Sequence, residues 1–172
     1  VRPGRYSFNV YTEFNGNVNK IGSKFFEVER IRTGVLSNPN LDQIEAFLVD
    51  LENTYKNYSV VNHKFSKIKR SNKSIPSLIS KTSNYKSYVE SYNQIKEMIN
   101  MIDVFVSGNK SKKDIMEKDT ETISDRLSVA VRGINSSYGP TSMQISSLDK
   151  AKSLITEFDN MLKELSLEFN KL

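Results

Sequence analysis

The sequence predicts a mainly α protein in which an N-terminal β-hairpin is followed by a four-helix up-and-down bundle. Apolar residues recur at every second position near the N-terminus, which is the period of a strand, and at every third or fourth position from Leu41 onward, which is the period of an amphipathic helix. The 172 residues are 37% hydrophobic and 26% charged, with seven Gly and four Pro, a composition that excludes collagen-like and low-complexity chains. We expect residues 1–33 to be a hairpin that ends a β-sandwich domain and residues 34–172 to be the bundle.

The hairpin is predicted from two alternating stretches. Residues 5–14 place Tyr6, Phe8 and Val10 on one side and Ser7, Asn9 and Tyr11 on the other. The turn sequence Asn-Gly-Asn at 15–17 follows, and residues 24–31 alternate again. An isolated hairpin is marginal in water, so it either packs on the helices or is the last pair of a larger sheet. We favour the larger sheet, and we expect its other strands to precede Val1, with the chain being a fragment of a larger protein.

The first predicted helix is long and begins near Leu41. Its apolar positions are Ile44, Phe47, Leu48, Leu51, Tyr55, Tyr58, Val61, Phe65 and Ile68. Asn40 with Gln43 three residues later forms a plausible N-cap pair, and Pro39 is tolerated just ahead of it. The polar run 71–74 and Pro76 predict the end of this helix.

The second and third helices are predicted from 85 to 106 and from 123 to 134. The second carries Tyr85, Tyr88 and Tyr92 on one face, which we take as packing or interaction aromatics, and we expect Gly108 to end it in a left-handed conformation. Residues 110–120 have too little apolar periodicity to be buried, so we expect a mobile loop, with a frayed helix as the alternative.

The fourth helix follows the connector Ser136–Pro140. Thr141 and Gln144 have the spacing of a capping box, and an apolar face then continues to the C-terminus. We expect Gly139 to adopt positive φ as the residue after the third helix, with Tyr138 packing into the end of the bundle.

A basic stretch is the most uneven feature of the charge distribution. No acid occurs between Glu52 and Glu90, and eight cations do. We single out Lys64, Lys67, Lys69, Arg70 and Lys73 as a candidate polyanion contact, because clustered cations gain affinity by releasing counterions. The alternative is a solvated helix end whose cations complement the helix dipole. No helix-turn-helix or zinc-finger pattern accompanies the stretch, which disfavours nucleic acid as the partner.

The sequence contains no recognisable set of catalytic or metal-binding residues. There is no Cys, the one histidine is His63, and no phosphate-binding glycine motif occurs, so we predict no catalytic residue, no metal ligand and no cofactor. Carboxylates such as Asp50 and Glu52, or Asp119 and Glu121, have a spacing that solvated helix faces also show. No stretch has the roughly 20 apolar residues of a membrane span. The chain is therefore expected not to be an enzyme.

Two stretches resemble a known family. The strand 3–10 (PGRYSFNV) and the later run 26–30 (FEVER) resemble the end of the small β-sandwich domain of bacterial BNR-repeat, sortilin-like β-propeller proteins. The segment 127–165, with INSSYGPT at 134–141, is similar to the helical tail that closes those chains. The propeller's Asp-box repeat does not occur here, so the resemblance assigns no catalytic residue.

The resemblance implies the C-terminal part of a larger extracytoplasmic protein, in the periplasm, at the cell surface or secreted. Combined with the helical patterning, it leads us to expect a non-catalytic structural or protein-interaction module that docks through a helix face onto its own propeller or a partner chain. The alternative is a carbohydrate-binding or accessory region of a glycoside hydrolase-like protein, which would need exposed tyrosines.

Overall fold

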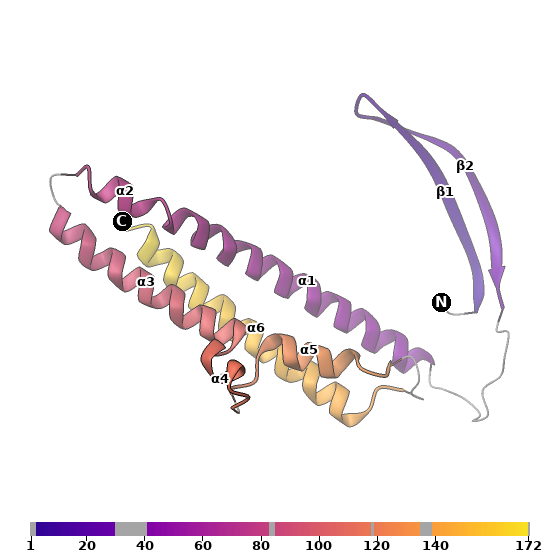
Figure 1. The fold of residues 1–172 in the computed structure, drawn as a ribbon. Helices are drawn as coiled ribbons and strands as arrows, with labels where there is room; N and C mark the ends of the chain where they lie inside the picture. Colours follow the sequence, from indigo (N-terminus) through magenta and orange to yellow (C-terminus); the bar gives the residue numbers. More distant parts are fainter. Residues whose placement is uncertain (1–2, 30–40, 83–84, 118, 135–138, 172) are drawn as a thin grey trace. The chain divides into compact units, whose positions relative to one another are not determined.

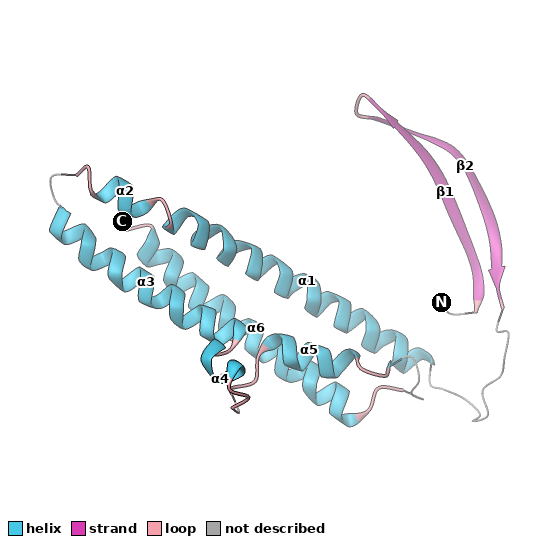
Figure 2. Cartoon of the chain, in the orientation of Figure 1, coloured by secondary structure: helices cyan, strands magenta, loops and turns pink. Residues whose placement is uncertain are grey.

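The computed structural model describes residues 3–29, 41–82, 85–117, 119–134 and 139–171. The chain divides into two compact units, residues 1–41 and 42–172 (Figure 1). The first is an antiparallel hairpin and the second is helical, so the predicted mainly α class with an N-terminal hairpin and four longer helices is confirmed (Figure 2).

The hairpin consists of β1 (Gly4–Phe14) and β2 (Asn17–Val28). Asn15 and Gly16 form the turn between them with φ of 51° and 78°. Both values are positive, as a two-residue hairpin turn of the Asn-Gly type requires. The second strand therefore starts at Asn17, and our prediction that it starts at Lys24 is wrong, because the polar residues Asn17, Asn19 and Lys20 obscured the strand pattern.

The register gives the hairpin one aromatic face. Tyr6 pairs with Phe26, and their rings stack at a centroid distance of 5.8 Å, while the Phe8 and Phe26 rings lie 6.2 Å apart. A bulge between Val10 and Tyr11 of the ladder shifts the register of the turn-proximal half. Alternation along β1 places Val10 and Phe14 on the same face as Tyr6.

The first helix, α1 (Leu41–Asn72), ends where the sequence predicts. Its predicted N-cap Asn40 lies outside the described residues. Pro76 lies in the first turn of a further short helix, α2 (Ile75–Ile79). The backbone N–H that proline lacks would have no intrahelical partner in the first turn, so proline does not destabilise the helix there. Ile75 and Ile79 of this helix are buried.

The helix α3 (Tyr85–Ser107) ends at Gly108, which has φ of 78° and donates its N–H to the Val104 carbonyl at 2.8 Å. The predicted left-handed glycine is confirmed here. Residues 110–120 contain the five-residue helix α4 (Lys110–Asp114), capped by the Asn109 side chain. The structure thus agrees with the helical alternative over 110–114.

A carboxylate closes the segment between α3 and α5 (Ile123–Val131). Asp119 accepts a hydrogen bond from the backbone N–H of Asn109, and Lys113 Nζ donates to the Ser107 carbonyl at 2.5 Å. These contacts join the two ends of the segment 107–119, so it is a closed loop with internal hydrogen bonds. Sequence periodicity does not report such polar contacts.

The connector before the last helix corrects one prediction. The helix α5 ends at Val131, and Gly133, with φ of 75°, is the left-handed residue after it. Gly139 is therefore not the residue that ends the third helix, and our prediction placed this helix end too late. The predicted packing of Tyr138 lies outside the described residues.

The last helix, α6 (Ser142–Phe169), begins with the predicted capping box. Thr141 Oγ1 accepts a hydrogen bond from the Gln144 N–H at 3.2 Å, and the Thr141 N–H donates to Gln144 Oε1 at 2.8 Å. The Gln144 Nε2 also donates to the Arg132 carbonyl at 2.8 Å. This bond ties the start of α6 to the end of α5.

In the helical unit, α3 and α5 follow one another along α6, and both run opposite to it (Figure 1). The bond between Gln144 and Arg132 joins the start of α6 to the end of α5, whereas Phe169 at the end of α6 lines one pocket with Tyr88 at the start of α3. The start of α1 lies near the start of α6, since Lys152 Nζ contacts Asp50 Oδ2 at 2.5 Å.

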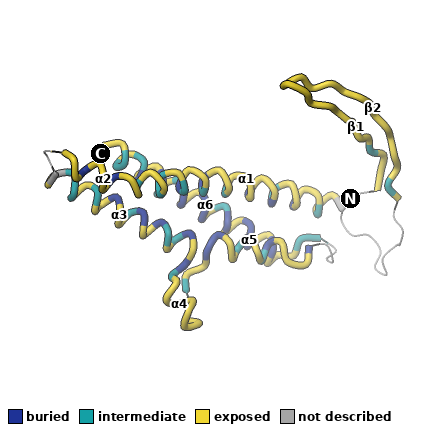
Figure 3. The backbone as a smooth tube through the Cα atoms, turned by 45° about the horizontal axis from the view of Figure 1, so that its top comes forward, coloured by how far each residue is buried: buried dark blue, intermediate teal, exposed yellow. Residues whose placement is uncertain are grey.

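One apolar core runs through the helical unit, and buried positions recur along the inner side of each long helix (Figure 3). Phe158 of α6 is fully buried and meets Phe65 of α1 edge to face at 5.7 Å. The core residues are Phe47, Leu51, Val61, Phe65, Ile95, Ile99, Ile102, Val106, Ile123, Leu127, Ala130, Ile134, Leu148, Ala151, Leu154, Ile155, Phe158, Leu162 and Leu165.

Candidate functional site

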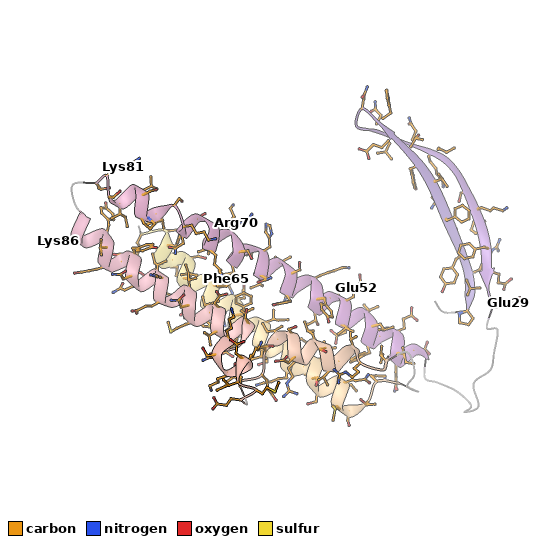
Figure 4. The ribbon with its side chains drawn as sticks, viewed as in Figure 1. Glu29, Glu52, Phe65, Arg70, Lys81 and Lys86 are labelled. Atoms are coloured by element: carbon orange, nitrogen blue, oxygen red, sulfur yellow. The ribbon has the colours of Figure 1, made fainter. Side chains whose placement is uncertain are left out.

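The basic cluster lies on the last third of α1 and just beyond it. Lys64, Lys67, Arg70 and Lys73 are exposed, and Figure 4 marks Arg70 on the outer side of α1. No carboxylate pairs with these four side chains in the part of the chain that the structure describes.

Lys69 differs from its neighbours. Its Nζ contacts Asp103 Oδ2 of α3 at 2.5 Å and lies 5.4 Å from the centre of the Phe65 ring. The side chains of Lys69 and Asp103 are 37% and 41% exposed, so the pair is partly shielded from water. Lys69 therefore holds α1 against α3, and its charge is neutralised by a carboxylate that the sequence did not identify as its partner.

A groove of about 350 Å³ opens beside the cluster, between α1 and the end of α3. Arg70 and Lys73 contribute cations to its lining, and Asn62 and Ser66 contribute neutral polar groups. The Arg70 Nε donates to the Ser66 carbonyl at 3.3 Å, which orients the guanidinium. Its two Nη groups remain available for a bidentate contact with an anion.

The spacing of the cations follows from helix geometry. Residues three apart on a helix have Cβ atoms about 5–6 Å apart, so Lys64, Lys67 and Arg70 form a row. At 3.6 residues per turn this row occupies about 120° of the helix circumference, away from the core residue Phe65. Like charges at this spacing destabilise a helix by a few tenths of a kcal/mol per pair. The helix gains nothing from Lys64 and Lys67 as C-terminal caps, because the dipole effect is confined to the last turn.

The predicted aromatic stripe does not form an exposed platform among the described residues. Tyr88 and Tyr92 are half-buried, and Tyr88 lines a small apolar pocket with Ile79 and Phe169 at one end of the helical unit. Burial raises the pKa of Tyr58, which packs against the core. The side chain of Tyr85 lies outside the described set.

The carboxylates that could have served as an acid–base pair are engaged in structural contacts. Asp50 pairs with Lys152, and the hydrogen bond and charge of Lys56 lower the pKa of Glu52. The backbone N–H groups of Asn109 and Thr120 lower the pKa of Asp119. The lowered pKa values of Glu52 and Asp119 keep these two carboxyl groups ionised at neutral pH, which is the opposite of what a general acid needs.

The aromatic face of the hairpin is a second candidate surface, which the sequence patterns showed only as a strand face. Phe8 and Phe26 are 48% and 46% exposed, and Phe14 near the turn is 76% exposed. The opposite face carries more polar side chains, but it also exposes Tyr11, Val18 and Phe25 at 55%, 61% and 62%. Arg5 is stacked over the Phe25 ring at 4.8 Å. The sequence contained a signal for this face: Tyr6 and Phe8 are two residues apart on the first strand, and Phe26 pairs with Tyr6 on the second.

The sequence matches no protein-family model and no curated protein, and the fold matches no solved structure. Within the described ranges, no helix combines the length and apolar character that crossing a membrane requires. The same residues contain no group of three or more His, Asp or Glu side chains arranged to hold a metal ion.

Proposed function

We propose that this chain is a non-catalytic structural or protein-interaction module, in which the helical unit is self-supporting and the hairpin adds two strands to a β-sheet of a protein partner. The observation that carries this proposal is the aromatic face of the hairpin, which no second layer covers within the hairpin itself. Phe8, Phe26 and Phe14 expose 46–76% of their surface there.

A two-stranded ribbon has no stable core of its own. Both β1 and β2 are edges, so each leaves a row of backbone N–H and C=O groups without a strand partner within the hairpin. Three or more strands with a covered apolar face are needed for independent stability in water. A neighbouring strand would pair one of these edges, and a second layer would cover the aromatic face.

The dimensions of the ribbon favour a sheet as the partner. Eleven residues at about 3.4 Å each give a length of roughly 37 Å, and two strands give a width of about 10 Å. One face therefore offers about 370 Å², well below the roughly 800 Å² per partner of a stable interface. Edge pairing to a larger sheet makes up the difference, because it extends the interface through backbone hydrogen bonds.

The resemblance of 3–10, 26–30 and 127–165 to sortilin-like propeller proteins supports a more specific form of the proposal. In this form the chain is the C-terminal part of a larger extracytoplasmic β-propeller protein, and the sheet belongs to its sandwich domain or to a partner chain. The second candidate is a carbohydrate-binding or accessory region. Its candidate tyrosines are Tyr11, Tyr58, Tyr85, Tyr88, Tyr92 and Tyr138. Tyr11 on the hairpin is 55% exposed, and Tyr58, Tyr88 and Tyr92 are half-buried, while Tyr138 and the side chain of Tyr85 lie outside the described set.

Photo-cross-linking from the two faces of β1 tests the docking mode. A photoreactive amino acid replaces Phe8 on the aromatic face or, as the matched control, Asn9 on the opposite face, in cells that produce the protein. We expect mass spectrometry to identify cross-links from position 8 to strands of a β-sheet domain and none to that domain from position 9. Equal cross-linking from both positions, or cross-links from position 8 only to the helices of this chain, would refute the docking mode.

Turnover assays test the non-catalytic part. Chromogenic glycosides and peptides should show no rate above the buffer blank with the purified chain. A clear rate that disappears when one carboxylate is replaced by its amide would overturn the assignment, because it would locate a catalytic group in this chain.

A further inference from the structure

We propose that the exposed cations at the end of α1 form a binding site for an acidic polysaccharide, with Arg70 at its centre and Lys67 and Lys73 on either side. This inference is independent of the hairpin docking described above, because it concerns only the helical unit.

Helix stability explains only part of this charge, because Arg70 lies in the last turn of α1, where a cation complements the helix dipole, whereas Lys67 lies before that turn. Lys67, Arg70 and Lys73 follow one another at three-residue intervals and have no carboxylate partner among the described residues. Repulsion between Lys67 and Arg70 disfavours α1, whereas Lys73 follows the end of that helix. Residues 53–89 contain eight cations and no acid, so no nearby carboxylate along the chain relieves the repulsion.

The groove gives the site a shape as well as a charge. Arg70 and Lys73 lie at the junction between the solvent-facing row and the groove of about 350 Å³. Lys69 and Asp103 also line the groove. Because they form an ion pair with each other, the Lys69 charge is already neutralised and contributes little to binding an anion. A chain lying along Lys64, Lys67 and Arg70 could therefore place one sulfate or carboxylate group in the groove beside Lys73.

The neighbouring side chains favour a polysaccharide over a nucleic acid. Asn62 and Ser66 line the groove and offer amide and hydroxyl groups that suit sugar hydroxyls. Single-stranded nucleic acid binds by stacking bases on exposed aromatic rings. Between residues 59 and 82, Phe65 is 2% exposed and cannot serve as such a ring, which leaves the imidazole of His63 as the single exposed ring for stacking.

Fluorescence anisotropy with a labelled heparin octasaccharide tests the proposal on the full chain. The test variant is K67Q/R70Q/K73Q, which leaves the Lys69–Asp103 pair intact. The control variant is K20Q/K96Q/K150Q, which removes three exposed lysines from three other elements. Both variants change the net charge from +5 to +2, so any difference between them reports position and not total charge.

We expect the test variant to bind about 10- to 100-fold more weakly than the unmodified chain, because three charge-assisted contacts are lost. The control variant should stay within about twofold, and the slope of log affinity against log salt should flatten by roughly two to three in the test variant alone. Unchanged thermal unfolding of both variants will show that the fold is intact.

Three outcomes would overturn the proposal. The first is an absence of heparin binding by the unmodified chain at low salt, and the second is an equal loss in the two variants. The third is equal or tighter binding of a duplex DNA of matched charge or of anionic phospholipid vesicles, because the site would then lack the stated ligand class.

Discussion

Gly108 is the position where a single methyl group should have the largest local effect on the helical unit. It is buried at the end of α3, and its φ of 78° lies in the left-handed region. A Cβ added there would lie 2.8 Å from Lys113 Cε and 3.0 Å from Asp119 Oδ2. Both atoms belong to the contacts that close the segment 107–119, so Gly108→Ala strains the backbone and displaces that closure.

The expected magnitude follows from two opposing effects. A left-handed conformation costs an L-residue roughly 1–2 kcal/mol, whereas alanine stabilises by about 0.4–1 kcal/mol through the unfolded state. Displacing the Lys113 side chain adds to the loss, and we expect a net destabilisation of about 1–2 kcal/mol. In a chain of this length that corresponds to a lower melting temperature by roughly 2–8 °C.

Urea unfolding followed by far-UV circular dichroism measures this difference. Gly108→Asn is the matched variant, because asparagine tolerates the left-handed region and should lose less stability than alanine. Gly139→Ala is the control for the unfolded-state effect, since Gly139 belongs to the helical unit, has no positive φ, and its Cβ would come no closer than 3.6 Å to Gln43 Oε1. If Gly108→Ala is as stable as the unmodified chain, Gly108 does not hold the left-handed conformation that ends α3, and the reasoning is wrong.

Three further predictions concern the core, a cap and a carboxylate. Phe158→Ala should lower the free energy of unfolding by about 3–5 kcal/mol in urea titrations. Leu167→Ala on the exposed side of α6 should change it by less than about 0.5 kcal/mol. Similar losses in both variants would contradict the burial of Phe158 in the core. Thr141→Ala should cost about 1 kcal/mol in the same assay and Thr141→Ser far less, and equal losses would show that the hydroxyl does not cap α6. The pKa of Asp119 is lower in the folded loop than its ordinary value of 3.8, so its stabilisation of the loop is present above that value and is lost as the pH falls through the folded pKa. The protection factor of the Asn109 amide hydrogen, measured by NMR, should therefore fall in that acidic range and should be low at all pH values in Asp119→Ala; a protected amide in that variant would contradict the contact.

The helical part of the fold could be predicted well because its signals are local. The 3.6-residue period identified the long helices, and the Thr141–Gln144 spacing identified a cap whose two hydrogen bonds the structure confirms. The equivalent cap of α5 at Thr122 was missed, because its third residue is Asp125 and not the Glu or Gln of the usual capping box.

The errors arose where two residues could play the same part. Both Gly133 and Gly139 can adopt positive φ, and the sequence alone did not show that α5 ends before the first of them. Pro76 can either end a helix or begin one, and here it begins α2. The start of β2 at Asn17 was hidden by polar residues that fit an exposed ribbon as well as a loop.

The candidate site was predictable in composition but not in detail. The sequence showed the unpaired run of cations, yet it could not show that Lys69 is neutralised by Asp103, which lies 34 residues away along the chain. The groove beside Arg70 depends on the packing of α3 against α1 and has no local signature. Tertiary contacts of this kind decide which of several similar cations remain free to bind a ligand.

Hydrogen exchange of the isolated chain, followed by mass spectrometry, tests the central claim most directly. If the helical unit is self-supporting and the hairpin needs a sheet partner, peptides from residues 4–28 should exchange within seconds. Peptides from the core of α3 and α6 should be protected by several orders of magnitude, toward the limit set by global unfolding. Protection of residues 4–28 equal to that of α6 would contradict the account, because the hairpin would then be stable without the partner that the proposed function requires.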